Sequence, residues 1–257
     1  MRYPLWILTL LIVSPIAIGA TPGWQPNILI LMAEDMSARV GAFGDPVART
    51  PNLDAMAAEG VRFPNTFTSA GVCAPSRAAL ITGIHQISLG AQHMRTSTSP
   101  VANYLAVPEP AVKAFPELLR AAGYYTFTDR KLDYQFSGVF AGSGPFTIWD
   151  AEGEGDHLRD APVDVPFFGL MNFFITHESA SFTVASQAVA SQADNPRGAT
   201  LARAAATARA RLSDPIAPET VTVPPYYPDE PRVREHIADF YNNVQVMDAQ
   251  VGRILKT

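Results

Sequence analysis

The sequence predicts an α/β fold with an open, mostly parallel sheet flanked by helices. Short apolar runs alternate with segments that carry helix start and stop signals, and acids, a lysine and a histidine stand where the apolar runs end. The chain has 257 residues, 47% of them hydrophobic, which is enough for one large globular domain. In such a sheet the ligand site lies beyond the carboxyl ends of the strands. We therefore expect the functional residues at those ends.

The first predicted strand is PNILILMAED, Pro26 to Asp35, which is too short for helical periodicity and ends in two acids. The segment Thr50 to Gly60 predicts a short surface helix, because a proline occupies its first helical position and a glycine ends it. Ala74 to Gly83 has the same signals, a proline near the start and a glycine at the end, and so predicts a second helix with Cys73 just before its N-terminus.

Two further segments complete the alternation. Phe115 to Asp129 predicts a helix that a glycine ends and that runs into a strand. Val165 to Ser179 predicts another apolar strand with polar residues at its carboxyl end. Arg232 to Lys256 carries apolar residues close to helical spacing and predicts a long amphipathic helix.

The segment Ser181 to Pro215 differs in composition from the rest of the chain. It is dominated by Ala, Ser, Gln and Arg and lacks large apolar side chains. We interpret residues 181–215 as a low-complexity surface insertion that is partly helical or disordered.

Residues 1–20 have the layout of a secretory signal peptide, with Arg2 ahead of an apolar run from Leu5 to Val13 and small residues after it. The run is too short and too interrupted by proline for a convincing spanning helix. We therefore expect a secreted or periplasmic protein with no stable membrane anchor; a retained anchor is the alternative. The net charge of −5 and the absence of a Lys/Arg-rich run argue against a nucleic-acid partner.

Cys73 is the only cysteine, and it stands in GVCAPSRAALITG, Gly71 to Gly83. A single cysteine cannot form an internal disulfide, although the predicted export would allow one. The thiol is therefore either a buried small hydrophobe or a chemically special group.

The stretch Gly71 to Gly83 matches the sulfatase signature throughout, and PNILILMAEDMSARVGAFGD and TPNLDAMAAEGVRFPNTFTSAG are similar to the opening of that family. The chain resembles the type I, formylglycine-dependent sulfatases of the alkaline phosphatase superfamily from about Pro26 to Ile254, with 181–215 unmatched. AEDMS, HMRTS, ITHES and PPYYPDEPRVR are most similar to the sulfamidase and heparan-type branch. The resemblance implies an alkaline-phosphatase-like fold, with residues 24–257 as the N-terminal catalytic region.

The resemblance also implies that a formylglycine-generating enzyme oxidises Cys73 to Cα-formylglycine, with Pro75 and Arg77 as recognition elements. The aldehyde hydrate has two hydroxyls: one attacks the sulfur, and the other loses its proton and expels sulfate as the aldehyde re-forms. Arg77 is further expected to steady this nucleophile and the charge on the metal side; an exposed arginine on a helix is the alternative. The adjacent helix N-terminus favours a bound oxyanion.

Glu34 and Asp35 are expected to bind Ca²⁺ or Mg²⁺ together with the group derived from Cys73, because carboxylates are the hard oxygen ligands that these ions prefer. Most of the family has two aspartates at this point, so Glu34 departs from the pattern. The alternative is that both acids only cap the following turn.

Lys131 stands where the family has a lysine that contacts the sulfate. A shift of the alignment by one residue would place Arg130 there instead. The family commonly has a histidine two residues later. Here that position is Asp133, which puts in doubt any role that needs an imidazole and leaves the residue to orient its neighbours. A lysine that is merely solvated is the alternative.

His177 matches the family histidine that helps to protonate the leaving group, a task suited to a side chain that titrates near neutral pH. A polar residue at a strand end can equally be a satisfied structural group. His93 and Arg95 are expected to reach a substrate anion from a loop; a loop without a binding role is the alternative.

The predicted function is a sulfatase-like hydrolase that cleaves sulfate esters or N-sulfo groups of a small molecule or glycan. Complete family members continue for about as many residues again and supply further metal ligands, so we expect an N-terminal part truncated before the C-terminal region, with little turnover of its own. The alternatives are a catalytically incompetent fragment and a phosphate or phosphonate monoester hydrolase of the same superfamily.

Overall fold

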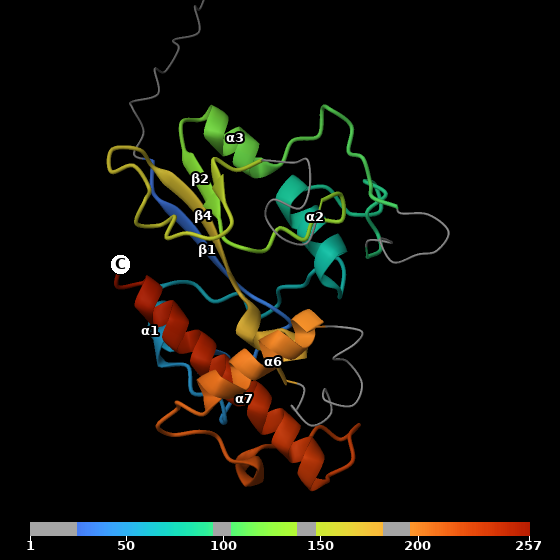
Figure 1. Cartoon of the computed structure of the whole chain (residues 1–257), viewed down its shortest axis with the longest axis vertical. Coiled ribbons are helices and arrows are strands. Elements are labelled where there is room, and N and C mark those ends of the chain that lie inside the picture. Colours follow the sequence, from blue (N-terminus) through green and yellow to red (C-terminus); the bar gives the residue numbers. More distant parts are fainter. Residues whose placement is uncertain (1–24, 95–103, 138–147, 182–195) are drawn as a thin grey trace, which may run out of the picture.

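The protein contains a four-stranded parallel sheet with helices on both faces (Figure 1). The computed structural model describes residues 25–94, 104–137, 148–181 and 196–257. The strands are β1 (Ile28–Ala33), β2 (Tyr125–Thr128), β3 (Ala151–Glu152) and β4 (Phe167–Phe173), in the order β1-β4-β2-β3. This arrangement confirms the predicted parallel sheet flanked by helices. The predicted signal peptide lies outside the described residues.

The helices follow the start and stop signals of the sequence. The six described α-helices are α1 (Pro51–Glu59), α2 (Cys73–Thr82), α3 (Phe115–Ala121), α4 (Glu178–Ser181), α6 (Pro196–Arg209) and α7 (Pro231–Ile254). Short 3₁₀ helices are η1 (Gly41–Phe43), η2 (Phe174–Thr176) and η3 (Pro218–Thr220). Proline stands in the first turn of α1, α3 and α7, where its missing N–H would be unpaired in any case. In the described ranges no helix combines the length and the apolar character that crossing a membrane requires.

Strand β1 supplies apolar side chains to both faces of the sheet, as expected for a strand covered on two sides. Ile28, Ile30 and Met32 pack against the core that α2 and α3 cover. Leu31 and Ala33 pack against the second core, which includes the buried side chains of α7. The sheet is therefore the middle of three layers.

Helix α7 is the long amphipathic helix that the sequence predicts. Its buried residues Val244, Met247 and Val251 lie at intervals of three and four, which places them on one helical face against the sheet. Helix α6 also contacts α7, and its buried Ala205 belongs to the same core cluster as these residues. The described part of the predicted insertion is thus a packed helix; residues 182–195 lie outside the described residues.

Strands β1, β4 and β2 end at the same edge of the sheet, because parallel strands share one direction. Ala33 of β1 pairs with Phe173 of β4, and Thr128 of β2 pairs with Leu170. Strand β4 therefore extends beyond the end of β2. The residues that follow these three ends meet in one place, which is described next.

Candidate active site

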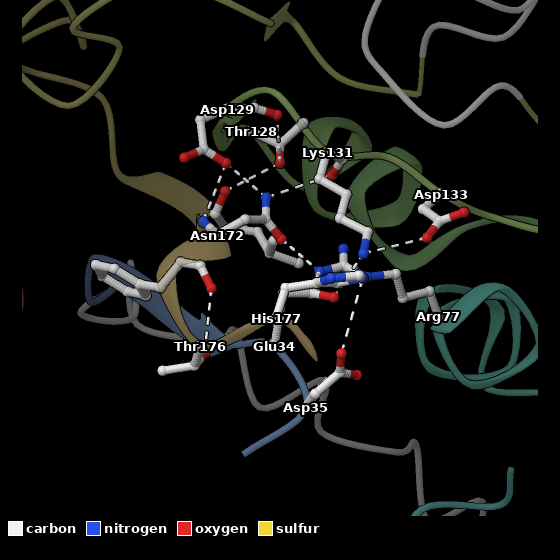
Figure 2. A network of polar contacts seen from close by, with 12 residues as sticks. Glu34, Asp35, Arg77, Thr128, Asp129, Lys131, Asp133, Asn172, Thr176 and His177 are labelled. Atoms are coloured by element: carbon white, nitrogen blue, oxygen red, sulfur yellow. Dashed lines mark hydrogen bonds and ion pairs between the residues drawn. The ribbon is translucent and has the colours of Figure 1, made fainter. Parts of the chain in front are cut away.

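A buried cluster of charged side chains lies beyond the carboxyl ends of the strands (Figure 2). Glu34 follows β1, Lys131 and Asp133 follow β2, and Arg77 comes from α2. All four side chains are at most 5% exposed. Charged residues are almost never this buried unless they are paired, so the pairing within the cluster is the feature to explain.

Glu34 is held between two cations. Its Oε1 accepts a hydrogen bond from Arg77 Nη2, and its Oε2 lies 2.5 Å from Lys131 Nζ. Lys131 Nζ also lies 3.2 Å from Asp133 Oδ2, so two positive and two negative groups alternate. Burial on its own raises the pKa of Glu34, but the charges and hydrogen bonds of Arg77 and Lys131 together hold that pKa below its ordinary value. Glu34 is consequently ionised at neutral pH.

Cys73 is the first residue of α2 rather than the residue before it, a one-position difference from the expected boundary. Its thiol is partly buried, and the Asp133 carboxylate lies near enough to influence its ionisation. Burial, followed by the negative charge of Asp133, raises the pKa of the thiol. Val72 provides no side-chain cap, so the first-turn amides of α2 receive no acceptor from the residue that precedes the helix.

Asp35 and Asp133 are the described non-glycine residues with positive φ, at 43° and 50°. Aspartate tolerates the left-handed region better than most residues because its short side chain can bond locally. Such conformations persist where the surroundings hold them, and they concentrate at functional sites. Asp133 belongs to the buried cluster, and the more exposed Asp35 follows Glu34 at its edge.

Asn172 and Asp129, which bond to the charged cluster or to each other, were not among the predicted site residues. Asn172 on β4 accepts a hydrogen bond from Arg77 Nη2 at 2.7 Å and donates from Nδ2 to Asp129 Oδ1 at 2.5 Å. Burial raises the pKa of Asp129, although these hydrogen bonds oppose that shift. The available signal was an amide inside the apolar run FFGLMNFF.

His177 and Asp35 lie together at the more exposed rim of the cluster. His177 does not end β4 directly, because η2 intervenes between the strand and the histidine. Its Nε2 lies 3.7 Å from Asp35 Oδ2, and that carboxylate also accepts a hydrogen bond from the Glu178 amide at 3.0 Å. This rim joins the carboxyl end of β1 to the segment after β4.

The remaining predicted residues are separated from this cluster. Arg130 is exposed and pairs with Glu154 at 2.9 Å, whereas its neighbour Lys131 is buried in the cluster. His93 is exposed, and its ring packs edge-on against Tyr104 at 5.1 Å between centroids. Arg95 lies outside the described residues.

The donor chemistry of Glu34 and Asp35 fits a hard divalent cation, since both offer carboxylate oxygens at the end of one strand. Both oxygens of Glu34 already accept from Arg77 and Lys131, and Asp35 contacts His177 and the Glu178 amide. Within the described ranges no three His, Cys, Asp or Glu side chains converge as a metal-binding group would. The two carboxylates therefore offer a partial ligand set.

Known structures share this architecture and define its class. The structure of a protein in complex with its substrate D-glucosamine-2-N,6-O-disulfate aligns with a TM-score of 0.56 at 14% identity, covering 90% of this chain and 62% of that chain. A phosphonate monoester hydrolase of Agrobacterium radiobacter aligns with a TM-score of 0.53 at 16% identity, covering 90% and 59%. The fold is thus the alkaline-phosphatase-like α/β fold that the sequence predicts.

Sequence relatives identify the family within that class. The protein-family model described as Sulfatase matches residues 26–257. The ulvan-active sulfatase of Formosa agariphila is 38% identical over 246 residues, which cover 90% of this chain and 40% of that relative. The N-acetylgalactosamine-6-sulfatase of Sus scrofa is 42% identical over 121 residues, which cover 45% of this chain and 23% of that relative.

The chain belongs to the sulfatase family, which confirms the predicted type I assignment. It spans about two fifths of the length of the ulvan-active relative. The closer placement in the sulfamidase and heparan-type branch stays a prediction.

Proposed function

We propose that this chain carries the nucleophile and the anion-binding groups of a sulfuric ester hydrolase that cleaves sulfate esters or N-sulfo groups. The observation that carries the proposal is the position of Cys73, within the sulfatase signature and at the first turn of α2, beside a buried cluster with two cations. Membership of the sulfatase family supports the reaction class. A sulfated glycan is the proposed substrate class, because one relative is an ulvan-active sulfatase and one structural neighbour was solved with a disulfated glucosamine.

The surroundings of Cys73 argue against the thiol itself as the nucleophile. A raised pKa keeps the sulfur protonated at neutral pH, and the thiolate is the reactive form. Conversion of Cys73 to formylglycine by a formylglycine-generating enzyme removes this obstacle. The hydrated aldehyde supplies one hydroxyl that attacks sulfur and a second whose deprotonation expels sulfate.

The surrounding residues then have separable tasks. Lys131 and Arg77 offset negative charge on the sulfate and on the nucleophile. Both side chains are buried, and electrostatic interactions are stronger away from water. His177 at the rim is suited to donate a proton to the departing oxygen. Asp133 holds Lys131 and the residue 73 side chain.

A divalent cation, Ca²⁺ or Mg²⁺, completes the proposal. Glu34 and Asp35 would hold it, with the oxygen of the converted residue 73 as a further ligand, and it would neutralise the negative charge that gathers when sulfate enters. Substrate-anion contacts by His93 and Arg95, and export through cleavage of residues 1–20, remain parts of the proposal.

The experiment is hydrolysis of nitrophenyl sulfate and nitrophenyl phosphate by the full gene product, coexpressed with a formylglycine-generating enzyme. We expect metal-dependent release that favours the sulfate ester, and no release by Cys73→Ala. Equal activity of Cys73→Ala would refute the proposal. A preference for the phosphate ester would assign the protein to the phosphate or phosphonate hydrolases, and no activity with either ester would indicate a catalytically incompetent product.

A further inference from the structure

Asn172 occupies a position where the pattern of the strand calls for an apolar residue. It lies on β4 on the same face as Phe168 and Leu170, both of which pack in the core. Its side chain is 7% exposed. An amide buried at such a position is destabilising unless its polar atoms are bonded, so its partners account for its presence.

Every polar group of the Asn172 amide has a partner in the site. Oδ1 accepts from Arg77 Nη2 at 2.7 Å, while Nδ2 donates to Asp129 Oδ1 at 2.5 Å and to the Lys131 carbonyl at 3.3 Å. The guanidinium can only donate, and a carboxylate and a carbonyl can only accept. The network therefore allows one orientation of the amide, because a flip would set NH₂ against the guanidinium.

Asp129 anchors this amide to two strands. Its Oδ1 also accepts from the backbone N–H of Asn172 at 3.0 Å, and its own N–H donates to the Leu170 carbonyl at 3.4 Å. Figure 2 shows Asp129 and Asn172 to the left of Lys131 and Asp133, with Asp35 at the bottom of the network. The amide is thus fixed before any ligand arrives.

We infer that Asn172, anchored by Asp129, is a positioning residue that sets the spacing between the Arg77 guanidinium and the chain at Lys131. The inference rests on the proposed function only for the roles of these two cations. Glu34 and Asn172 both accept from Nη2 of Arg77.

The first test is Asn172→Leu, which keeps the branched shape of the side chain and removes its three hydrogen bonds. We expect kcat for nitrophenyl sulfate to fall by about 10- to 100-fold with KM changed by less than about 3-fold, because a misplaced cation stabilises the transition state less well. Nitrogen-15 NMR of the arginine side chains supplies a readout without catalysis. The Arg77 Nη signals, assigned with Arg77→Lys, should be resolved in the parent and exchange-averaged in Asn172→Leu.

A second set of variants tests whether the hydrogen bonds of residue 172, and not only its burial, matter for activity. Asn172→Asp alone places two carboxylates at hydrogen-bonding distance and should lose activity. The double variant Asp129→Asn with Asn172→Asp exchanges the groups, keeps the net charge and retains an acceptor facing Arg77. The exchange loses the bond to the Lys131 carbonyl and one of the two bonds at Asp129 Oδ1, because one atom of an asparagine at 129 cannot both donate to residue 172 and accept its backbone N–H. We therefore expect kcat of the double variant to rise above that of Asn172→Asp and to stay below that of the parent.

The matched control is Asn242→Leu, which removes a buried amide on α7 that bonds the Ile216 N–H and carbonyl at 2.7 and 3.0 Å. It should lower stability and leave kcat unchanged. The inference is overturned if Asn172→Leu behaves like this control, with unchanged kcat and unchanged Arg77 signals. If the parent hydrolyses no ester, the proposed function fails, and the Arg77 signals alone decide the positioning role.

Discussion

Each buried charged residue of the site is stabilised by an oppositely charged neighbour. Glu34, Lys131 and Asp133 form a continuous line of ion pairs in which each charge faces an opposite one. Removing one partner from such an arrangement leaves an uncompensated buried charge, which costs far more than an exposed pair would contribute. The same ion pairs influence Cys73, because Asp133, the last residue of the series, raises the pKa of the thiol in addition to the effect of burial.

Substitution Lys131→Met should therefore lower the free energy of unfolding by about 3 kcal/mol, since it leaves Glu34 and Asp133 facing fewer positive charges. Arg130→Met is the control, because it removes an exposed pair with Glu154 and should change stability by less than about 1 kcal/mol. Urea unfolding measures both. Equal small losses in the two variants would show that the ion pairs of Lys131 are unimportant.

The unconverted thiol offers a second prediction. Burial and, after it, the charge of Asp133 raise the pKa of Cys73, so Asp133→Asn should lower that pKa and increase the thiolate fraction. The gain in thiolate outweighs its reduced nucleophilicity. Iodoacetamide should therefore alkylate Cys73 faster at pH 8 in Asp133→Asn than in the parent, while the exposed-site control Asp164→Asn keeps the parent rate. A slower or unchanged rate in Asp133→Asn would contradict the assigned contact.

Individual elements place these residues by close packing within the sheet. Gly169 on the central strand β4 faces the ring of Phe127, and a Cβ there would lie 2.3 Å from Cζ of that ring. Glycine is needed here for close approach, and the same strand continues to Asn172. The position of the site thus depends on how tightly β4 and β2 pack.

Gly169→Ala should destabilise the protein by about 1–3 kcal/mol, because the buried ring of Phe127 must move to admit a methyl group. Gly71→Ala is the matched control, since a Cβ at Gly71 meets nothing within 4 Å. It should change the free energy of unfolding by less than about 0.5 kcal/mol. Unfolding curves that coincide for the two variants would contradict the observed packing.

The elements with strong local signals were predictable from the sequence. β1, α1, α2 and α7 follow from an apolar run, from proline and glycine at helix ends, and from helical periodicity. β3 was not predicted, because a two-residue strand has no period to detect. The contacts of Asn172 and Asp133 depend on which strands become neighbours, and a single sequence does not contain that information locally.

At the scale of the whole molecule, two cores hold the site from opposite faces of the sheet. On one face α2 delivers Cys73 and Arg77, and on the other α7 packs against η2, which precedes His177. Asp248 of α7 also accepts hydrogen bonds from the Asn52 and Leu53 amides and so caps α1. Residues from distant parts of the chain are thereby fixed around one edge of the sheet.

Metal binding should stabilise the molecule as a whole if Glu34 and Asp35 hold the ion. At a calcium concentration 100 times its Kd the gain is about 2.7 kcal/mol, provided that the unfolded chain does not bind calcium. Thermal unfolding with and without calcium measures it. Asp35→Asn should remove most of the increase, and Asp164→Asn should keep it. An equal increase in both variants would place the calcium elsewhere.

The most direct measurement is mass spectrometry of the tryptic peptide Phe63–Arg77 from protein that hydrolyses a sulfate ester. The account predicts that residue 73 has lost its sulfur and carries an aldehyde oxygen. An intact thiol at Cys73 in a fully active sample would contradict the central claim.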